Sequence, residues 1–218
     1  ELEDQKKFAV FLGTNPKEVE LTIKQAQVLQ SGDYKKHQAF EVEKYGYLAG
    51  LDQKTITKGV QAVYSGNLEV QKQISKQIFE SLSKKPEWNI ESVPDSEMLD
   101  AMIAEDIAIS KAAEAINSAK IDFWSSNVTQ GVTKDQIQKL SQQVGNILWE
   151  GNVDSYTINK VVDGINGYMN NGQYNNTQEI AAHFIAEMTG AEQVEALREL
   201  QSDKTWGSSE SIAEQAAR

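Results

Sequence analysis

The sequence predicts an all-α protein in which helical hairpins form a bundle or a short repeat-like array of about eight or nine helices. Strand signals are missing, because no stretch alternates apolar and polar residues over several positions with β-branched enrichment. Helix boundaries recur instead. An Asp, Asn or Thr opens a segment, since its side-chain oxygen accepts from first-turn N–H groups, and a Gly closes it. Only 3 of the 218 residues are Pro, which leaves long helices uninterrupted.

Four helices are predicted in the first part of the chain. Asn15 followed by Pro16 marks the first start, because Pro suits the first helical position. Asp33, Asp52 and Asn67 stand at or just after a glycine turn, where each can cap the next helix. The expected helices cover residues 15–32, 33–50, 52–66 and 67–85.

The second part of the chain predicts one long helix followed by shorter ones. After a loop over residues 84–95, Asp95 opens a helix that extends to about Ser125. Its apolar residues recur at seven-residue spacing and form a narrow seam, namely Met102, Ile109, Ile116 and Phe123. A capping box at Thr133-Lys134-Asp135-Gln136 starts the next helix. The later helices are expected over residues 133–150, 154–170 and 177–201, with a break at Gly190.

Four turns share one short pattern: an apolar residue, two variable residues, Gly, then Asp, Asn or Gln, then an apolar residue. Their glycines are Gly32, Gly66, Gly151 and Gly172. The first two lie 34 residues apart (66 minus 32), which is a period of helix–turn–helix repeats.

The first two turns, Gly32-Asp33-Tyr34 and Gly66-Asn67-Leu68, resemble the turns of tetratricopeptide repeats, and Lys85-Pro86 stands where such a repeat would end. The resemblance covers about residues 16–88 and implies stacked helical hairpins. The sequence departs from the pattern at His37, where a small residue is expected, and the later turns do not keep the period. The alternative interpretation is that Gly followed by Asx is simply how α-hairpins turn.

The predicted organisation follows from the loop and from the end of the 34-residue spacing. Residues 1–88 form a helical-hairpin half, residues 95–201 form the long helix with a C-terminal helical bundle, and residues 202–218 form a polar tail. One continuous domain is the alternative.

The charge balance restricts the partners. The net charge is −11, and the only arginines are Arg198 and Arg218, so the positive stripe that phosphate backbones require is missing and nucleic acid is not an expected partner. No apolar run approaches the roughly 20 residues of a membrane span. The absence of cysteine excludes disulfides and thiolate metal sites.

The two histidines offer the one candidate metal site. His37 precedes Glu41 by four residues and His183 precedes Glu187 by four, so each pair shares a helix face. If the two faces meet, two imidazoles and two carboxylates could hold a metal. Against this interpretation, metal sites in helical bundles use Glu and His at three-residue spacing, and a glutamate near a histidine is common in an acidic helical chain. The sequence predicts no catalytic residue and no cofactor, because it contains neither a phosphate-binding loop nor a nucleophile elbow.

Acidic and aromatic residues offer further candidates. Carboxylate pairs for acid–base chemistry can be drawn from Glu41, Glu43, Glu105 and Asp106, although most of the 32 acidic residues are expected on solvated faces. The four tryptophans stand at predicted helix ends or in loops, where each can close the core or together form a binding surface; they are Trp88, Trp124, Trp149 and Trp206.

The expected function is that of a non-enzymatic helical protein with a protein partner, in an interaction, structural or accessory role and with oligomerisation allowed. The first residue is Glu1, which favours an exported or proteolytically processed protein. Ile-Ala-Glu triplets ending at Glu105, Glu187 and Glu214 resemble the cleavage sites of tailed-phage prohead proteases, which implies a processed virion component. Two alternatives are open: a metal-dependent enzyme that uses the two His–Glu faces, and a carrier of an apolar ligand inside the bundle.

Overall fold

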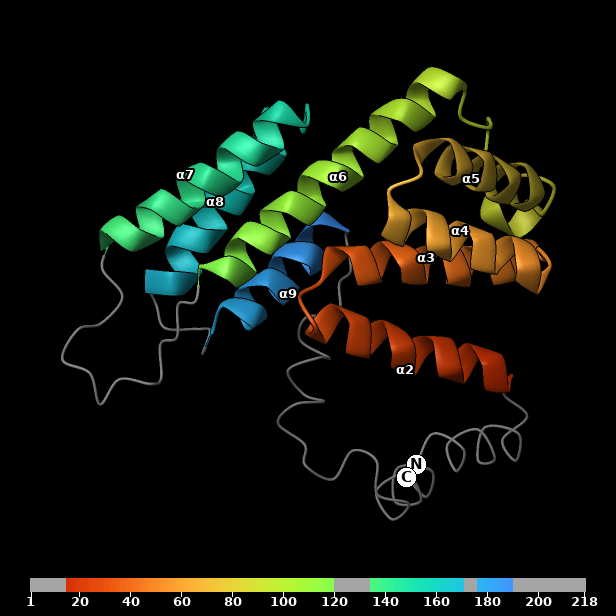
Figure 1. Cartoon of the computed structure of the whole chain (residues 1–218), viewed down its shortest axis with the longest axis horizontal. Coiled ribbons are helices and arrows are strands. Elements are labelled where there is room, and N and C mark those ends of the chain that lie inside the picture. Colours follow the sequence, from red (N-terminus) through yellow and green to blue (C-terminus); the bar gives the residue numbers. More distant parts are fainter. Residues whose placement is uncertain (1–14, 120–133, 171–175, 190–218) are drawn as a thin grey trace, which may run out of the picture.

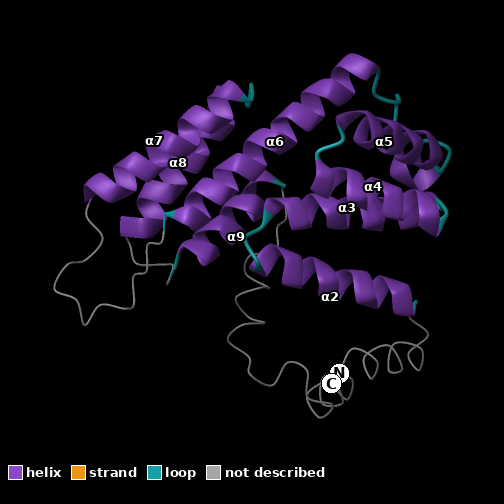
Figure 2. Cartoon of the chain, in the orientation of Figure 1, coloured by secondary structure: helices purple, strands orange, loops and turns teal. Residues whose placement is uncertain are grey.

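The computed structural model describes residues 15–119, 134–170 and 176–189. These ranges contain eight α-helices, one short 3₁₀ helix and no β-strand, which confirms the predicted all-α class (Figure 2). None of these helices combines the length and the apolar composition that a membrane span requires.

The first four helices begin where their Asx caps predict. They are α2 (Pro16–Gln30), α3 (Tyr34–Ala49), α4 (Gln53–Ser65) and α5 (Leu68–Leu82). Each is preceded by a side-chain oxygen that accepts a 3.0–3.2 Å hydrogen bond from a first-turn N–H group; the caps are Asn15, Asp33, Asp52 and Asn67. A cap of this kind satisfies one of the free donors at the helix start.

The second part of the chain contains the longest helix and three shorter ones. After η1 (Pro86–Trp88) come α6 (Ser96–Ser118), α7 (Lys134–Glu150), α8 (Ser155–Asn170) and α9 (Thr177–Met188). Asp95 caps α6 through a 2.8 Å bond from the Met98 N–H, as expected. The predicted continuation of α6 to Ser125, the segment 190–201 and the tail 202–218 lie outside the described residues.

The glycine turns are confirmed at two positions and corrected at a third. Gly32 and Gly66 adopt the left-handed conformation, with φ of 64° and 69°. At the turn between α7 and α8, however, the left-handed residue is Asn152, with φ of 57°, and Gly151 is not in that region. A Cβ on Gly151 would lie 2.2 Å from the Cβ of Ala108, so this glycine is needed for the close approach of the turn to α6. Gly172 lies outside the described residues.

Helix α6 runs between two groups of helices (Figure 1). It packs against α7 and α9 on one side and against α3 and α5 on the other. The predicted seam along α6 is confirmed at Ile109 and Ile116, which are both buried. It is wrong at Met102, which is 40% exposed, because its neighbour Ile103 is the residue that is buried. Phe123 lies outside the described residues.

The larger hydrophobic core lies among α6, α7, α8 and α9 and also contains Leu29 of α2 and Tyr34 of α3. The α2–α3 turn lies against this core: the Asn117 side-chain amide donates to the Gly32 carbonyl at 2.9 Å, and a Cβ on Gly32 would lie 3.0 Å from the Cβ of Ala181. A smaller cluster of α3 and α5 residues is joined by Trp88. The two halves of the chain therefore share apolar surface, whose burial is the main favourable contribution to folding.

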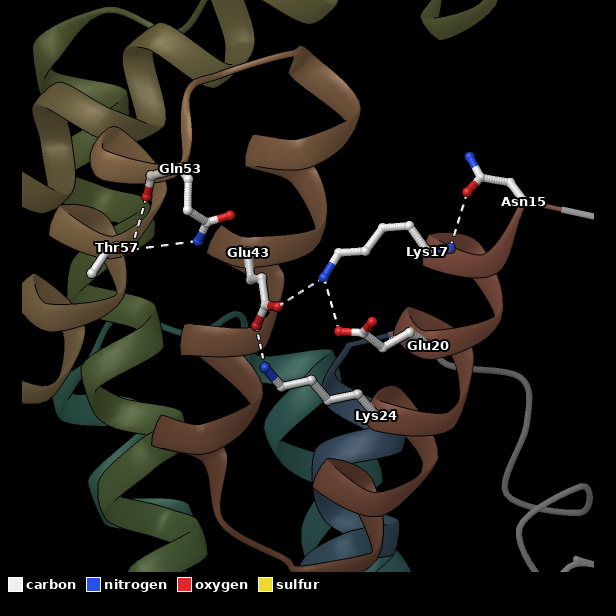
Figure 3. Close-up of polar contacts among 7 residues, drawn as sticks. All are labelled: Asn15, Lys17, Glu20, Lys24, Glu43, Gln53 and Thr57. Atoms are coloured by element: carbon white, nitrogen blue, oxygen red, sulfur yellow. Dashed lines mark hydrogen bonds and ion pairs between the residues drawn. The ribbon is translucent and has the colours of Figure 1, made fainter. Parts of the chain in front are cut away.

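Ion pairs connect α2 to α3 (Figure 3). The Lys17 ammonium lies 2.9 Å from Glu20 on its own helix and 3.5 Å from Glu43 on α3. Lys24 pairs with the other oxygen of Glu43. Partly exposed pairs of this kind contribute roughly 0–1 kcal/mol each, so they orient α2 more than they stabilise it.

Candidate functional site

A cavity of about 430 Å³ lies among α3, α4, α5, α6 and the segment that follows α5, and it is partly open to solvent. Most of its walls are aliphatic or aromatic. The apolar lining residues are Val42, Tyr45, Gly59, Val63, Ile74, Ile78, Phe79, Leu82, Trp88, Ile90, Met102 and Ile103. The polar ones are Gln38, Glu41, Gln71, Ser75 and Asp106.

Each helix presents one face to the cavity. On α3 and α5 the lining residues recur at spacings of three and four, which is the spacing of residues on one side of a helix. Gly59 allows α4 to approach both helices, because a Cβ there would lie 2.7 Å from Val42 and 2.9 Å from Ile74. Trp88 of η1 packs edge-on against Tyr45, with ring centroids 5.9 Å apart. These contacts shape the apolar part of the cavity.

Asp106 of α6 supplies a fixed carboxylate to the polar part. The Tyr34 hydroxyl donates to its Oδ1 at 2.6 Å, and the Gln38 side-chain amide donates to its Oδ2 at 3.0 Å. Burial raises the pKa of Asp106, and these two hydrogen bonds oppose the rise. Burial and the neighbouring Asp106 raise the pKa of Tyr34 far above its ordinary value, so Tyr34 acts as a donor.

Glu41 of α3 is the second carboxyl group of the cavity. Burial, followed by the charge of Asp106, raises its pKa to about 7, while the ammonium of Lys44 opposes the rise. Its side chain is 38% exposed. Near neutral pH Glu41 is therefore divided between its protonated and ionised forms.

His37 lies beside this pair but does not line the cavity. It stacks on Tyr34 with ring centroids 5.7 Å apart, and its side chain is 3% exposed. Its Nδ1 has no hydrogen-bond partner and lies 3.9 Å from Oε2 of Glu41, too far for a hydrogen bond. Burial and the charge of Lys44 lower the pKa of His37 to about 4, so the ring is neutral at neutral pH.

The second predicted pair lies on α9. His183 Nε2 is 3.8 Å from Glu187, and Glu187 also pairs with Lys160 of α8 at 3.0 Å. The structure thus forms each predicted pair but does not bring the two pairs together. Across the described ranges, no group of three or more His, Cys, Asp or Glu side chains could hold a metal ion.

Sequence reasoning found part of this site. Glu41 and Asp106 are among the candidate carboxylates, but nothing in the sequence distinguishes them from the other acidic residues, and no pattern marks the apolar face of α5 as the wall of a cavity. That Trp88 closes the core is confirmed; the same expectation is wrong for Trp149, which is 67% exposed. Trp124 and Trp206 lie outside the described residues.

Comparisons with family models, curated proteins and solved structures found no match to this chain. The assignment of a function therefore depends on the geometry and chemistry of the cavity. That geometry joins a mainly apolar chamber to two carboxyl groups.

Proposed function

We propose that this chain binds a small, mainly apolar molecule in the cavity between α3, α4, α5 and α6. The observation that carries the proposal is the cavity itself, whose volume of about 430 Å³ and mainly apolar lining with a few polar groups are typical of small-molecule sites. This is the carrier alternative considered from the sequence.

The packing of protein interiors supports a ligand. Interiors contain few voids larger than a water molecule, because atoms lining a void lose dispersion contacts. An apolar molecule in the cavity would restore such contacts for residues such as Ile74, Ile78 and Phe79. Because the cavity is partly open to solvent, the same molecule would also remove apolar surface from water, which favours binding.

The lining favours binding over hydrolysis. Among the described lining residues, hydroxyl groups come only from Tyr45 and Ser75, and neither histidine lines the cavity. A serine nucleophile requires a base within hydrogen-bond reach, and no hydrogen bond connects Ser75 to Glu41 or Asp106 in the described part of the chain. We therefore place the chain among binding proteins.

Titration of the purified chain with the neutral dye Nile red tests this function. We expect saturable, one-to-one fluorescence enhancement in the wild type. Ser75→Phe places a ring in the cavity and should weaken binding about tenfold or more, which corresponds to about 1.4 kcal/mol. Lys76→Phe is the matched control, because Lys76 is exposed and adjacent on α5. Equal binding by both variants, or non-saturable binding, would overturn the proposal.

A second candidate function is contact with another protein at the α7–α8 turn. Trp149 is 67% exposed and Tyr156 is 77% exposed, and the turn lies in the six residues between them, 150–155. Large exposed aromatic side chains dominate the binding energy of many interfaces. This observation supports the partner expected from the sequence.

Sedimentation equilibrium tests a second copy of the chain as that partner. We expect concentration-dependent association in the wild type that is lost in a Trp149→Ser, Tyr156→Ser variant. Tyr64→Ser is the control, because Tyr64 is also exposed but lies on α4. A wild-type chain that stays monomeric at all concentrations would contradict self-association through this surface.

A further inference from the structure

We propose that the ligand is an amphiphilic amine, whose apolar part fills the cavity and whose cationic nitrogen lies against Glu41 and Asp106. This inference rests on the proposed function and adds the chemical class of the ligand.

The lining of the cavity is acidic, although the ammonium of Lys44 offsets part of the Glu41 charge from outside the lining. Glu41 and Asp106 both line the cavity, and none of its described lining residues is Lys or Arg. Lys44 lies nearby on α3, but its ammonium is 3.4 Å from the Gln25 side chain and 5.4 Å from the Tyr45 ring centre, and Lys44 does not line the cavity. A cation from outside is the complement that this lining lacks.

The two carboxyl groups differ in a way that suits an ammonium group. Both oxygens of Asp106 already accept one hydrogen bond each, which orients the carboxylate, and each oxygen retains a free lone pair. Glu41 accepts no hydrogen bond from the described residues, and His37 Nδ1 at 3.9 Å is too distant to donate one. A bound cation would give Glu41 a partner of opposite charge.

Other ligand classes fit the charges less well. A fatty acid would place a further carboxylate beside Asp106 and the partly ionised Glu41, and a like charge in a partly buried site is costly. A neutral hydrocarbon would cover the carboxyl groups without pairing them, which is also unfavourable. An amine avoids both costs.

Aromatic residues support a cation in the same place. Tyr45 lies one helical turn after Glu41 on the same face of α3, and Trp88 packs against it. The charge of Glu41 contributes, after burial, to the raised pKa of Tyr45, which is consistent with their proximity. Aromatic rings attract cations through their negative faces, and this attraction is used to recognise alkylammonium groups. The Lys44 ammonium already lies over the Tyr45 ring, 5.4 Å from its centre, so Trp88 is the lining ring that we assign to a ligand cation.

Isothermal titration calorimetry with three probes of equal chain length tests the inference: decyltrimethylammonium, decanol and decyl sulfate. The two ionic probes are kept below their micelle concentrations and decanol below its solubility limit. The quaternary cation keeps its charge at every pH. We expect it to bind at least about tenfold more tightly than decanol, with decyl sulfate the weakest. Because the net charge is −11, the titrations are run at about 0.15 M salt, where long-range attraction is screened.

Variants of the two carboxyl groups test whether they bind the cationic probe. Glu41→Gln and Asp106→Asn should each weaken the cation about tenfold and leave decanol binding unchanged. Glu114→Gln is the matched control, because Glu114 is an exposed acid on α6 that does not line the cavity. Ser75→Phe should weaken both the cation and decanol.

The outcomes separate the two proposals. If decanol binds as tightly as the cation and the carboxyl variants change nothing, the amine assignment is overturned while the apolar cavity keeps its function. If the cation binds equally well to Ser75→Phe, it binds elsewhere on the acidic surface and the assignment also fails. If no probe binds the wild type, both proposals fail.

Discussion

The Tyr34 hydroxyl donates a 2.6 Å hydrogen bond to Oδ1 of Asp106, joining the first residue of α3 to the middle of α6 across 72 positions of sequence. Tyr34 also belongs to the core formed by the C-terminal helices. One side chain therefore connects that core to the polar part of the cavity.

Tyr34→Phe should destabilise the fold. The variant keeps the ring but removes the donor to Asp106, and a hydrogen bond to a charged group contributes about 1.5–3 kcal/mol. Chemical denaturation would show this loss in the free energy of unfolding. Tyr47→Phe is the control, because its hydroxyl accepts only an exposed 3.2 Å bond from Asn15; there we expect less than about 0.5 kcal/mol. A loss of equal size in both variants would contradict the role given to Tyr34.

The stability of the wild type should depend on Glu41 in the opposite sense to an ordinary carboxylate. Its pKa rises from 4.5 to about 7 on folding, so the folded state binds the proton more tightly. This contribution is complete below pH 4.5 and is lost as the pH rises through 7. The free energy of unfolding of the wild type should therefore fall as the pH rises from 4.5 through 7. Glu41→Gln should lack this fall, and chemical denaturation at several pH values measures it. A fall of the same size in Glu41→Gln would assign it to other groups.

His37 should make the stability depend on pH in the opposite direction to Glu41. Its pKa falls from 6.5 to about 4 on folding, so the unfolded state binds the proton more tightly. The contribution is complete above pH 6.5 and is lost as the pH falls through 4, by about 3–4 kcal/mol at most. His37→Leu should flatten this dependence without a large loss at pH 7, because the buried Nδ1 has no partner to lose. Chemical shifts of the His37 ring, followed by NMR, measure the pKa directly. A value near 6.5 would refute the prediction.

Gly151→Ala should cost about 1–3 kcal/mol, because the added methyl would lie 2.2 Å from the Cβ of Ala108. Ala108→Gly removes the opposing methyl. The double variant should therefore lose less stability than the sum of the losses in the two single variants. Gly167→Ala is the control: nothing lies within 4 Å of its added Cβ, and Ala is the better helix former, so stability should rise by about 0.5–1 kcal/mol. Thermal unfolding of the wild type and the four variants tests the set. Strict additivity of the two changes would show that the methyl groups do not meet.

The helix starts could be predicted because they depend on residues close in sequence. Asp33 and Asp52 each bind an N–H group three residues later, and that relationship is visible in the sequence alone. The third turn was mispredicted for the opposite reason. What requires Gly151 is Ala108 on another helix, and the local pattern gives no sign of it.

The candidate site could be predicted only in fragments. Gln38 and Glu41 meet Asp106 only after α6 has packed against α3, and the sequence holds 32 acidic residues from which to choose. The four-residue spacing of His37 and Glu41 was correctly seen as one helix face. Its surroundings were not foreseeable, because the burial of His37 and its stacking on Tyr34 depend on tertiary packing.

The placement of α6 has a consequence for how the molecule comes apart. Ile103 and Asp106 of α6 form part of the cavity wall. Ile109 and Ile116, one to three turns later on the same helix, lie in the core of the other half. Fraying from either side must break contacts along this one helix. The chain should therefore unfold as a single cooperative unit, and occupancy of the cavity should slow amide exchange in α7 and α9, far from any contact with the ligand.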